Sequence, residues 1–205
     1  MPPKPKCTKE EVIQAAFVIA RERGIEAVAA RELGKQLGTS ATPIFTLFKN
    51  MKEVQDEVRK LAMKEFEAYV ADALNYTPAF KYFGIQMIKF AKEEPKLFQI
   101  LYMQEHEESQ TYEEMEEELG EPARVCIGVI QKDYELTRQE AGIVFRQAWL
   151  HTFSICVLVA NKVCHFSEKE ISDILGMEVQ GTIALIKSGG YRNILIEQKK
   201  ISDRA

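Results

Sequence analysis

A helix-turn-helix is predicted between Arg31 and Phe48, and this feature constrains the fold more than any other in the sequence. Gly34 lies where two short helices would approach each other, because a larger side chain there would hold them apart. The apolar contact between the helices is expected from four residues at helical spacing: Leu33, Leu37, Ile44 and Leu47. In such a unit the second helix is the one that enters a DNA groove.

The turn between these two helices has its own residue signature. Gly38 fits a position with positive φ, which glycine reaches without a Cβ clash. Ser40 is expected to cap the second helix through its hydroxyl. Pro43 suits the first turn of that helix, because the N–H that proline lacks has no intrahelical partner there. These residues predict where the first helix ends and where the second begins.

Helix starts elsewhere are marked by a recurring capping box, in which Ser, Thr or Asn is followed three residues later by Glu. Four such pairs precede an apolar pattern of helical period: Thr8 with Glu11, Asn50 with Glu53, Thr137 with Glu140, and Ser167 with Glu170. No strand pattern competes with them. The sequence therefore predicts an all-α fold of about nine helices. They are expected near 8–23, 30–37, 41–48, 51–75, 78–94, a short stretch after Pro95, 124–134, 137–161 and 167–188.

The last two of these helices are long and apolar and contain small residues that permit close approach. Such a pair can supply half of a symmetric four-helix bundle formed by two copies of the chain. Packing within one chain is the alternative, and the residues leave both open.

Composition excludes several other classes of protein. The 205-residue chain has no uncharged apolar run near 18 residues, and its opening residues lack the apolar stretch of a secretory signal, so we expect a cytoplasmic protein with no membrane span. The four cysteines are scattered and form no CxxC pair, which argues against a zinc site or a disulfide scaffold. Reduced thiols are expected, with a redox-sensing pair as the alternative.

Charge is divided unevenly along the chain. Residues 1–60 hold 11 Lys and Arg against 8 Asp and Glu, whereas the remainder holds 16 against 23. A mildly basic first part on an acidic body suits a protein that meets phosphate with one end only.

Between Gln104 and Pro122 lie nine glutamates and His106 with no Lys or Arg, which favours a solvated helix end or a mobile loop. A cation site is the alternative, although no fixed ligand spacing supports it.

Catalytic signatures are missing from the sequence. It contains no Gly-rich phosphate loop, no HExxH, no recognisable Ser or Cys nucleophile motif and no carboxylate pair at metal-ligand spacing. We therefore expect no enzyme activity, no catalytic residue, no metal site and no cofactor.

The order of the parts resembles the tetracycline-repressor (TetR) family of bacterial regulators. The chain has a capped first helix, a helix-turn-helix that ends in Phe48-Lys49-Asn50, a long fourth helix and an acidic helical body. The similarity is strongest over residues 8–60. The body is similar only in its helix count, in a Glu-Pro-Lys-Leu-Phe junction at 94–98 and in an Ala-Trp-Leu-His segment at 148–151.

This resemblance implies a ligand-responsive transcriptional regulator that represses by binding double-stranded operator DNA and is released by an unknown small-molecule effector. It implies a homodimer formed through the helices near 137–161 and 167–188. It also implies three regions: a helix-turn-helix DNA-binding domain at 1–50, a helical effector-binding and dimerisation domain at 51–190, and a tail at 191–205. A helical interaction protein of the same fold, with lost or weakened operator binding, is the alternative.

The resemblance assigns DNA contacts to nine residues, which are Arg31, Ser40, Ala41, Thr42, Pro43, Phe45, Thr46, Lys49 and Lys52. Arg31 can grip phosphate or read a guanine edge, and the methyl and ring carbons of Thr42 and Pro43 can pack on a thymine methyl. Phe45 departs from the family, which usually has a tyrosine there, so a hydroxyl bond to phosphate is lost. Met51 stands where a lysine is common, so Lys49 or Lys52 would supply that charge.

Ala29 and Ala30 stand where hydroxyl residues often cap the second helix. Lys4 and Lys6 can compensate for missing contacts as a basic arm along the DNA backbone, with a solvated tail as the alternative.

An effector cavity is expected among the body helices. Aromatic and thioether side chains line small-molecule pockets, and seven residues are candidates on this basis: Phe83, Met87, Phe90, Tyr102, Met103, Trp149 and Phe153. Each is alternatively a core residue. His106 and His151 are candidate polar anchors.

Overall fold

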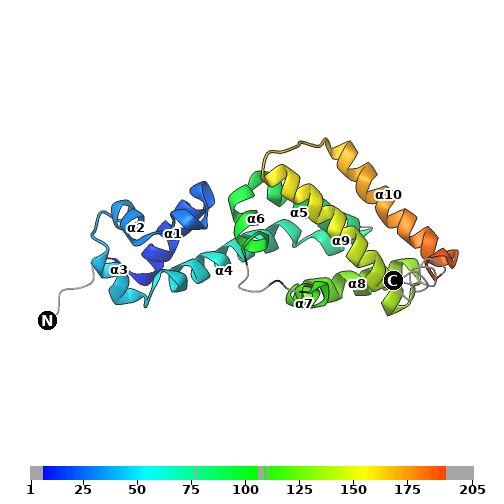
Figure 1. The fold of residues 1–205 in the computed structure, drawn as a ribbon, viewed down its shortest axis with the longest axis horizontal. Helices are drawn as coiled ribbons and strands as arrows, with labels where there is room; N and C mark the ends of the chain where they lie inside the picture. The colour runs from blue at the N-terminus through cyan, green and yellow to red at the C-terminus, as the bar shows by residue number, and fades with distance from the viewer. Residues whose placement is uncertain (1–6, 77, 106–108, 110, 193–205) are drawn as a thin grey trace, which may run out of the picture. The chain divides into compact units, whose positions relative to one another are not determined.

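The computed structural model describes residues 7–76, 78–105, 109 and 111–192, and within them it contains ten α-helices, two 3-10 turns and no strand (Figure 1). The predicted all-α class is confirmed. The helices are α1 (Lys9–Arg23), α2 (Ala30–Gln36), α3 (Thr42–Leu47), α4 (Met51–Val70), α5 (Ala79–Glu93), α6 (Pro95–Tyr102), α7 (Tyr112–Glu118), α8 (Gly120–Tyr134), α9 (Arg138–Ala160) and α10 (Glu168–Lys187). The 3-10 turns are η1 (Ile25–Ala27) and η2 (Ala73–Asn75).

The chain forms two compact units. The first unit combines Met1–Ala71, Lys89–Glu107 and Val159–Val163, so the helix-turn-helix shares it with α4 and α6. The second unit combines Asp72–Ile88, Glu108–Leu158 and Cys164–Ala205. These units group residues by packing, and the functional boundary expected after residue 50 stays a prediction.

The first unit is built around α1, which packs against α4 and α6. Its buried face comprises Val12, Ile13, Ala15, Ala16, Phe17, Ile19 and Ala20. The helix ends as predicted at Gly24, whose φ of 91° suits a residue without a Cβ. Near that end, Arg21 forms a two-bond ion pair with Glu94 at the start of α6. The amino-terminal support helix is therefore fixed to α6 by charge as well as by apolar contact.

Aromatic rings fill the space between α4, the end of α5 and α6. Phe66 lies edge-on to Phe90 and to Tyr102, with ring centroids 5.3 and 5.8 Å apart. Tyr69 packs against Phe90 at 5.2 Å and donates its hydroxyl hydrogen to Glu93 at 2.8 Å. Burial, and then the hydrogen bond to this carboxylate, raise the pKa of Tyr69 to about 12.

Of the four predicted capping boxes, three are complete. Thr8, Thr137 and Ser167 each complete the reciprocal capping box with the glutamate three residues on. Asn50 accepts from the Glu53 N–H at 3.0 Å, but the Glu53 carboxylate accepts from the backbone N–H of Lys49 instead of Asn50. The cap at the start of α4 is therefore only half of the predicted box.

Two of the predicted helix positions were wrong. The fourth helix was expected to reach about residue 75, but α4 ends at Val70 and the separate turn η2 follows it. The acidic segment was expected to be a helix end or a loop, but Tyr112–Glu118 forms α7 and α8 already begins at Gly120. His106 and the tail from residue 193 onward lie outside the described residues.

A local cap and one arginine account for α7. Thr111 forms a capping box with Glu114, a fifth box in addition to the four predicted from the sequence. The guanidinium of Arg146 on α9 lies 4.2 Å from the centre of the Tyr112 ring. Its Nη2 is 3.6 Å from a Glu113 oxygen and 3.7 Å from a Glu116 oxygen, so part of the acidic charge is neutralised within the second unit.

The core of the second unit gathers side chains from α5, α8, α9 and α10. Ile130, Ala141 and Val144 are fully buried in it. The helices α9 and α10 run antiparallel (Figure 1). His151 on α9 faces Glu178 on α10, with Nε2 and Oε2 3.4 Å apart.

All four cysteines are free thiols, and burial raises the pKa of Cys126 to about 12.

By length and composition alone, α9 is the one described helix that qualifies as a possible membrane span. In its most apolar window, 44% is buried inside the structure, and it carries part of the second unit's core. The core helix of a globular domain passes the same test, so this is weak evidence for a membrane.

Candidate nucleic-acid interface and cavity

The predicted helix-turn-helix is present in the first unit. Leu33 on α2 and Ile44 on α3 are fully buried, and Leu37 and Leu47 are half-buried. A Cβ added to Gly34 would lie 2.9 Å from the Thr39 carbonyl oxygen, so glycine is required there by the turn backbone rather than by α3 itself. Gly38 has the predicted positive φ, 64°.

The start of α3 corrects one prediction. The helix begins at Thr42, its N-cap residue is Ala41, and no side chain caps it. Ser40 lies one residue too early for its hydroxyl to reach the free N–H groups of the first turn, so the predicted Ser40 cap is wrong. Pro43 lies in that first turn, as predicted.

Solvent reaches most of the residues proposed to contact DNA. Arg31, Ser40, Thr42, Phe45, Thr46, Lys49 and Lys52 are exposed, and Ala41 and Pro43 are half-buried. Phe45 presents 53% of its surface to solvent. The Thr46 hydroxyl donates to the Pro43 carbonyl at 2.5 Å, which leaves its oxygen lone pairs as acceptors.

The cations around α3 differ in whether they are already paired. Lys35 and Arg23 both form ion pairs with Glu32, at 2.7 and 3.2 Å. Among the described residues no carboxylate pairs with the side chains of Arg31, Lys49 or Lys52. Phosphate contacts would therefore not require these three exposed cations to break an ion pair, and Lys49 is attracted electrostatically to Glu53.

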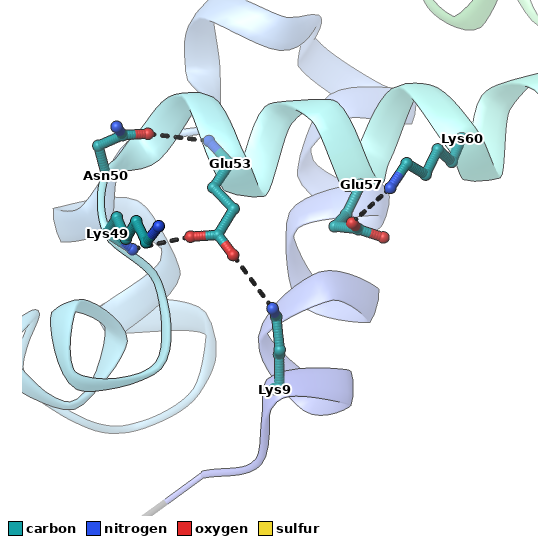
Figure 2. Close-up of polar contacts among 6 residues, drawn as sticks. All are labelled: Lys9, Lys49, Asn50, Glu53, Glu57 and Lys60. Atoms are coloured by element: carbon teal, nitrogen blue, oxygen red, sulfur yellow. Dashed lines mark hydrogen bonds and ion pairs between the residues drawn. The ribbon is translucent and has the colours of Figure 1, made fainter.

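Figure 2 shows the start of α4, where Glu53 organises the residues that follow α3. One Glu53 oxygen accepts from the Lys49 N–H at 2.8 Å, and the other accepts from Lys9 at 3.1 Å. The backbone bond from Lys49, and then the bond from Lys9, lower the pKa of Glu53. Lys9 also lies 4.8 Å from the centre of the buried Phe48 ring. These contacts fix the backbone at Lys49 while its side chain remains exposed.

A small cavity lies within the second unit. It is lined by Phe80, Lys81, Phe83, Gly84, Met87, Phe145, Ala148, Trp149, Thr152, Leu175 and Val179. Its free volume is about 20 Å³, roughly the space for one water molecule. Thr152 is the one polar side chain that is buried among the described residues, and Phe153 stacks on Trp149 with ring centroids 5.0 Å apart.

The structure divides the residues predicted for the effector cavity. Phe83, Met87 and Trp149 line the cavity, and Phe153 contacts Trp149. Phe90, Tyr102 and Met103 belong to the first unit. His151 lies on the exposed side of α9, where its Nδ1 is 3.0 Å from the Gln147 carbonyl oxygen.

Sequence reasoning missed Lys81, Gly84 and Thr152 as cavity residues. Gly84 follows Phe80 by four residues and precedes Met87 by three, so helical spacing already placed it on the face that carries the predicted residues. Thr152 follows Ala148 by four residues in the same way. A polar or small residue within the apolar face of a helix was the sequence pattern that could have identified these cavity residues.

No protein-family model and no curated protein sequence matches this chain. Among solved structures, it is similar to a TetR-like transcriptional regulator from Rhodococcus sp. RHA1, with a TM-score of 0.62. The sequence identity is 13%, and the match covers 90% of this chain and 98% of that chain. The fold is therefore TetR-like and all-α over nearly the whole chain.

Proposed function

We propose that this chain is a sequence-specific, DNA-binding transcriptional regulator of the cytoplasm, with no enzyme activity. In this proposal it represses as a homodimer and leaves operator DNA when a small-molecule effector binds. The observation that supports DNA binding best is that α3 exposes Thr42, Phe45 and Thr46, while the exposed Arg31, Lys49 and Lys52 form no ion pair with a described carboxylate. The TetR-like fold supports it independently, because the solved neighbour is a transcriptional regulator.

The chemistry of α3 suits a mixed interface. Thr42 offers a hydroxyl and a methyl group, and the exposed Phe45 ring offers an apolar face for a thymine methyl or a sugar. Arg31, Lys49 and Lys52 supply the phosphate contacts that position the helix without reading sequence. Since Phe45 has no hydroxyl, the affinity of the proposed complex depends more on these three charges.

Fluorescence anisotropy on the DNA that flanks the gene of this protein tests the proposal. The double variant Thr42→Glu/Lys49→Glu should abolish binding. Lys49→Glu alone should weaken binding and reduce the slope of the logarithm of the binding constant against the logarithm of the salt concentration by about one. Lys60→Glu is the matched control, because it changes the charge by the same amount. Lys60 forms an ion pair with Glu57, as Figure 2 shows. Lys60 lies eight residues after Lys52, about 12 Å along the axis of α4.

Three results separate the candidate functions. A sequence-specific regulator should bind DNA in the presence of competitor. Lys49→Glu should weaken this binding, and Lys60→Glu should leave the affinity within about twofold of the wild type. Equal weakening by both variants indicates nonspecific attraction to DNA. If neither the flanking DNA nor a genome-wide fragment selection gives a bound site, the helical interaction protein becomes the better proposal, and the departures at Phe45 and Met51 favour it.

The homodimer is proposed through α9 and α10. Leu150 on α9 exposes 40% of its surface, and Met177 on α10 exposes 77%. The small residues Gly181 and Ala184 are also exposed on α10. Met177→Glu should shift the sedimentation coefficient from dimer to monomer at micromolar concentration. Val163→Glu changes a comparably exposed apolar residue, 71% exposed, outside both helices and should leave the dimer intact.

A further inference from the structure

The cavity of the second unit combines an apolar interior with one cation at its edge. Phe80, Phe83, Met87 and Trp149 supply rings and a thioether, and no carboxylate is among its lining residues. Lys81 on α5 also lines it and donates to the Ser172 hydroxyl on α10 at 2.7 Å. Lys81 is half-buried, and an ammonium whose described partner is a neutral hydroxyl retains donors for an anion.

Two acidic groups of α10 are already engaged. Along α10, Asp173 accepts from Lys169 at 2.5 Å, and Glu178 faces His151 at 3.4 Å. In the described part of the chain no carboxylate forms an ion pair with Lys81. Its Nζ lies close to α10, since a Cβ added to Gly176 would lie 4.0 Å from that nitrogen. A positive centre without a counter-charge therefore lies beside an apolar cavity.

We propose that this cavity binds an apolar monocarboxylic acid, with the aryl or acyl body among the aromatic rings and the carboxylate on the Lys81 ammonium. The inference rests on the proposed function, because it names the chemical class of the effector. Carboxylate and ammonium form a charge-assisted hydrogen bond, and the hydroxyl of Ser172 can donate a second one to the same group. Cationic ligands are disfavoured because they would meet Lys81.

The free volume of about 20 Å³ is too small for such a ligand without rearrangement. Met87 is unbranched and can adopt other rotamers, which enlarges a cavity at modest cost. Gly84 limits the cavity on its α5 side, because an added Cβ would lie 3.3 Å from the Thr152 hydroxyl oxygen and 3.4 Å from a Leu175 methyl carbon. The ligand is therefore expected to be small, with a single ring or a short chain.

Three probes with one apolar body test the charge preference: phenylacetate, phenylacetamide and phenethylamine. Trp149 is the one tryptophan of the chain and lines the cavity, so its fluorescence reports binding in the full-length protein without DNA. Phenylacetate should bind at least tenfold more tightly than the other two. Lys81→Met should weaken phenylacetate binding about tenfold and leave the amide within twofold.

Two controls separate charge from folding. Lys132→Met removes an exposed lysine of α8 outside the cavity and should change nothing. Gly84→Ala should weaken phenylacetate binding by crowding the cavity, whereas Gly142→Ala, whose added Cβ meets no atom within 4 Å, should leave it unchanged. Circular dichroism melts of all four variants show whether each one is folded.

Equal affinity for acid and amide, no effect of Lys81→Met, or no response of Trp149 to any probe would overturn the proposed ligand class. These results leave the anisotropy test of DNA binding untouched, so they contradict the ligand and not the regulator. Conversely, if phenylacetate binds through Lys81 but no DNA site is found, the cavity assignment is supported and the proposed function fails.

Discussion

Replacing Gly34 by alanine tests the structure of the helix-turn-helix at its tightest point. The added Cβ would lie 2.9 Å from the Thr39 carbonyl oxygen, 3.3 Å from the Ser40 carbonyl carbon and 3.4 Å from the Ala41 nitrogen. All three are backbone atoms, so none can rotate away. The Thr39 N–H also donates to the Gly34 carbonyl at 2.8 Å, which ties the turn to α2 at the same residue. Relief of the contact requires the backbone of the turn to move.

The expected magnitude follows from two opposing terms. Alanine is favoured over glycine in a helix interior by about 0.5–1 kcal/mol. Overpacking against a backbone that cannot yield costs about 1–3 kcal/mol. Gly142→Ala on α9 has the first term without the second, because nothing lies within 4 Å of its added Cβ. We therefore expect Gly142→Ala to stabilise the protein, and Gly34→Ala to be about 1–3 kcal/mol less stable than this control.

Urea unfolding followed by far-ultraviolet circular dichroism measures this difference, provided that both variants keep the m-value of the wild type. DNA anisotropy supplies a second readout, since a displaced turn moves α3 and should weaken binding in Gly34→Ala alone. The reasoning is refuted if Gly34→Ala gains as much stability as Gly142→Ala. That result would mean that the turn lies further from α2 than the structure places it.

Three other features give measurable expectations. Burial raises the pKa of Cys126 to about 12, so at pH 8 this thiol is protonated and should react with Ellman's reagent far more slowly than the exposed Cys164; Cys164→Ser should remove the fast phase. A double-mutant cycle with Arg21→Met and Glu94→Gln should give a coupling of about 0.3–1 kcal/mol, since Arg21 is 45% exposed; a zero coupling would contradict the ion pair. Asn50→Ala removes the acceptor for the first turn of α4 and should cost about 1 kcal/mol, whereas Asn50→Asp should cost little.

The sequence was most informative where the residues that mark a structural feature lie within four residues of that feature. Thr8 and Ser167 were predicted as caps because the capping box is a local pattern, and the structure contains both boxes. Ser40 was predicted wrongly for a related reason, because a cap depends on which residue has non-helical dihedrals, and a shift of one residue removes it. The α7 helix was not predicted, because the box at Thr111 lies within a run of glutamates whose charge density favours a solvated segment.

The cavity was only partly predictable because its neighbours are distant in sequence. Met87 and Phe90 both carry the apolar character expected of a pocket, yet only Met87 lines one. Phe90 packs instead on Phe66 and Tyr69 of α4. Lys81 was missed because its partner Ser172 lies 91 residues further along the chain. Periodicity identifies which face of a helix is buried, but not which other helix covers it.

This division of α5 between two environments has a consequence for the proposed regulation. The helix belongs to the second unit up to Ile88 and to the first unit from Lys89. An effector changes DNA affinity only if it binds the two conformers of the protein with different affinity. A ligand too large for the present cavity meets this condition, because it binds only after Met87 or its neighbours have moved. A coupling of about 1–3 kcal/mol, typical of allosteric proteins, then requires no ligand contact with the first unit. Within α5, Met87 lies one turn before Phe90, and the Phe90 ring contacts Phe66 and Tyr69 within the first unit.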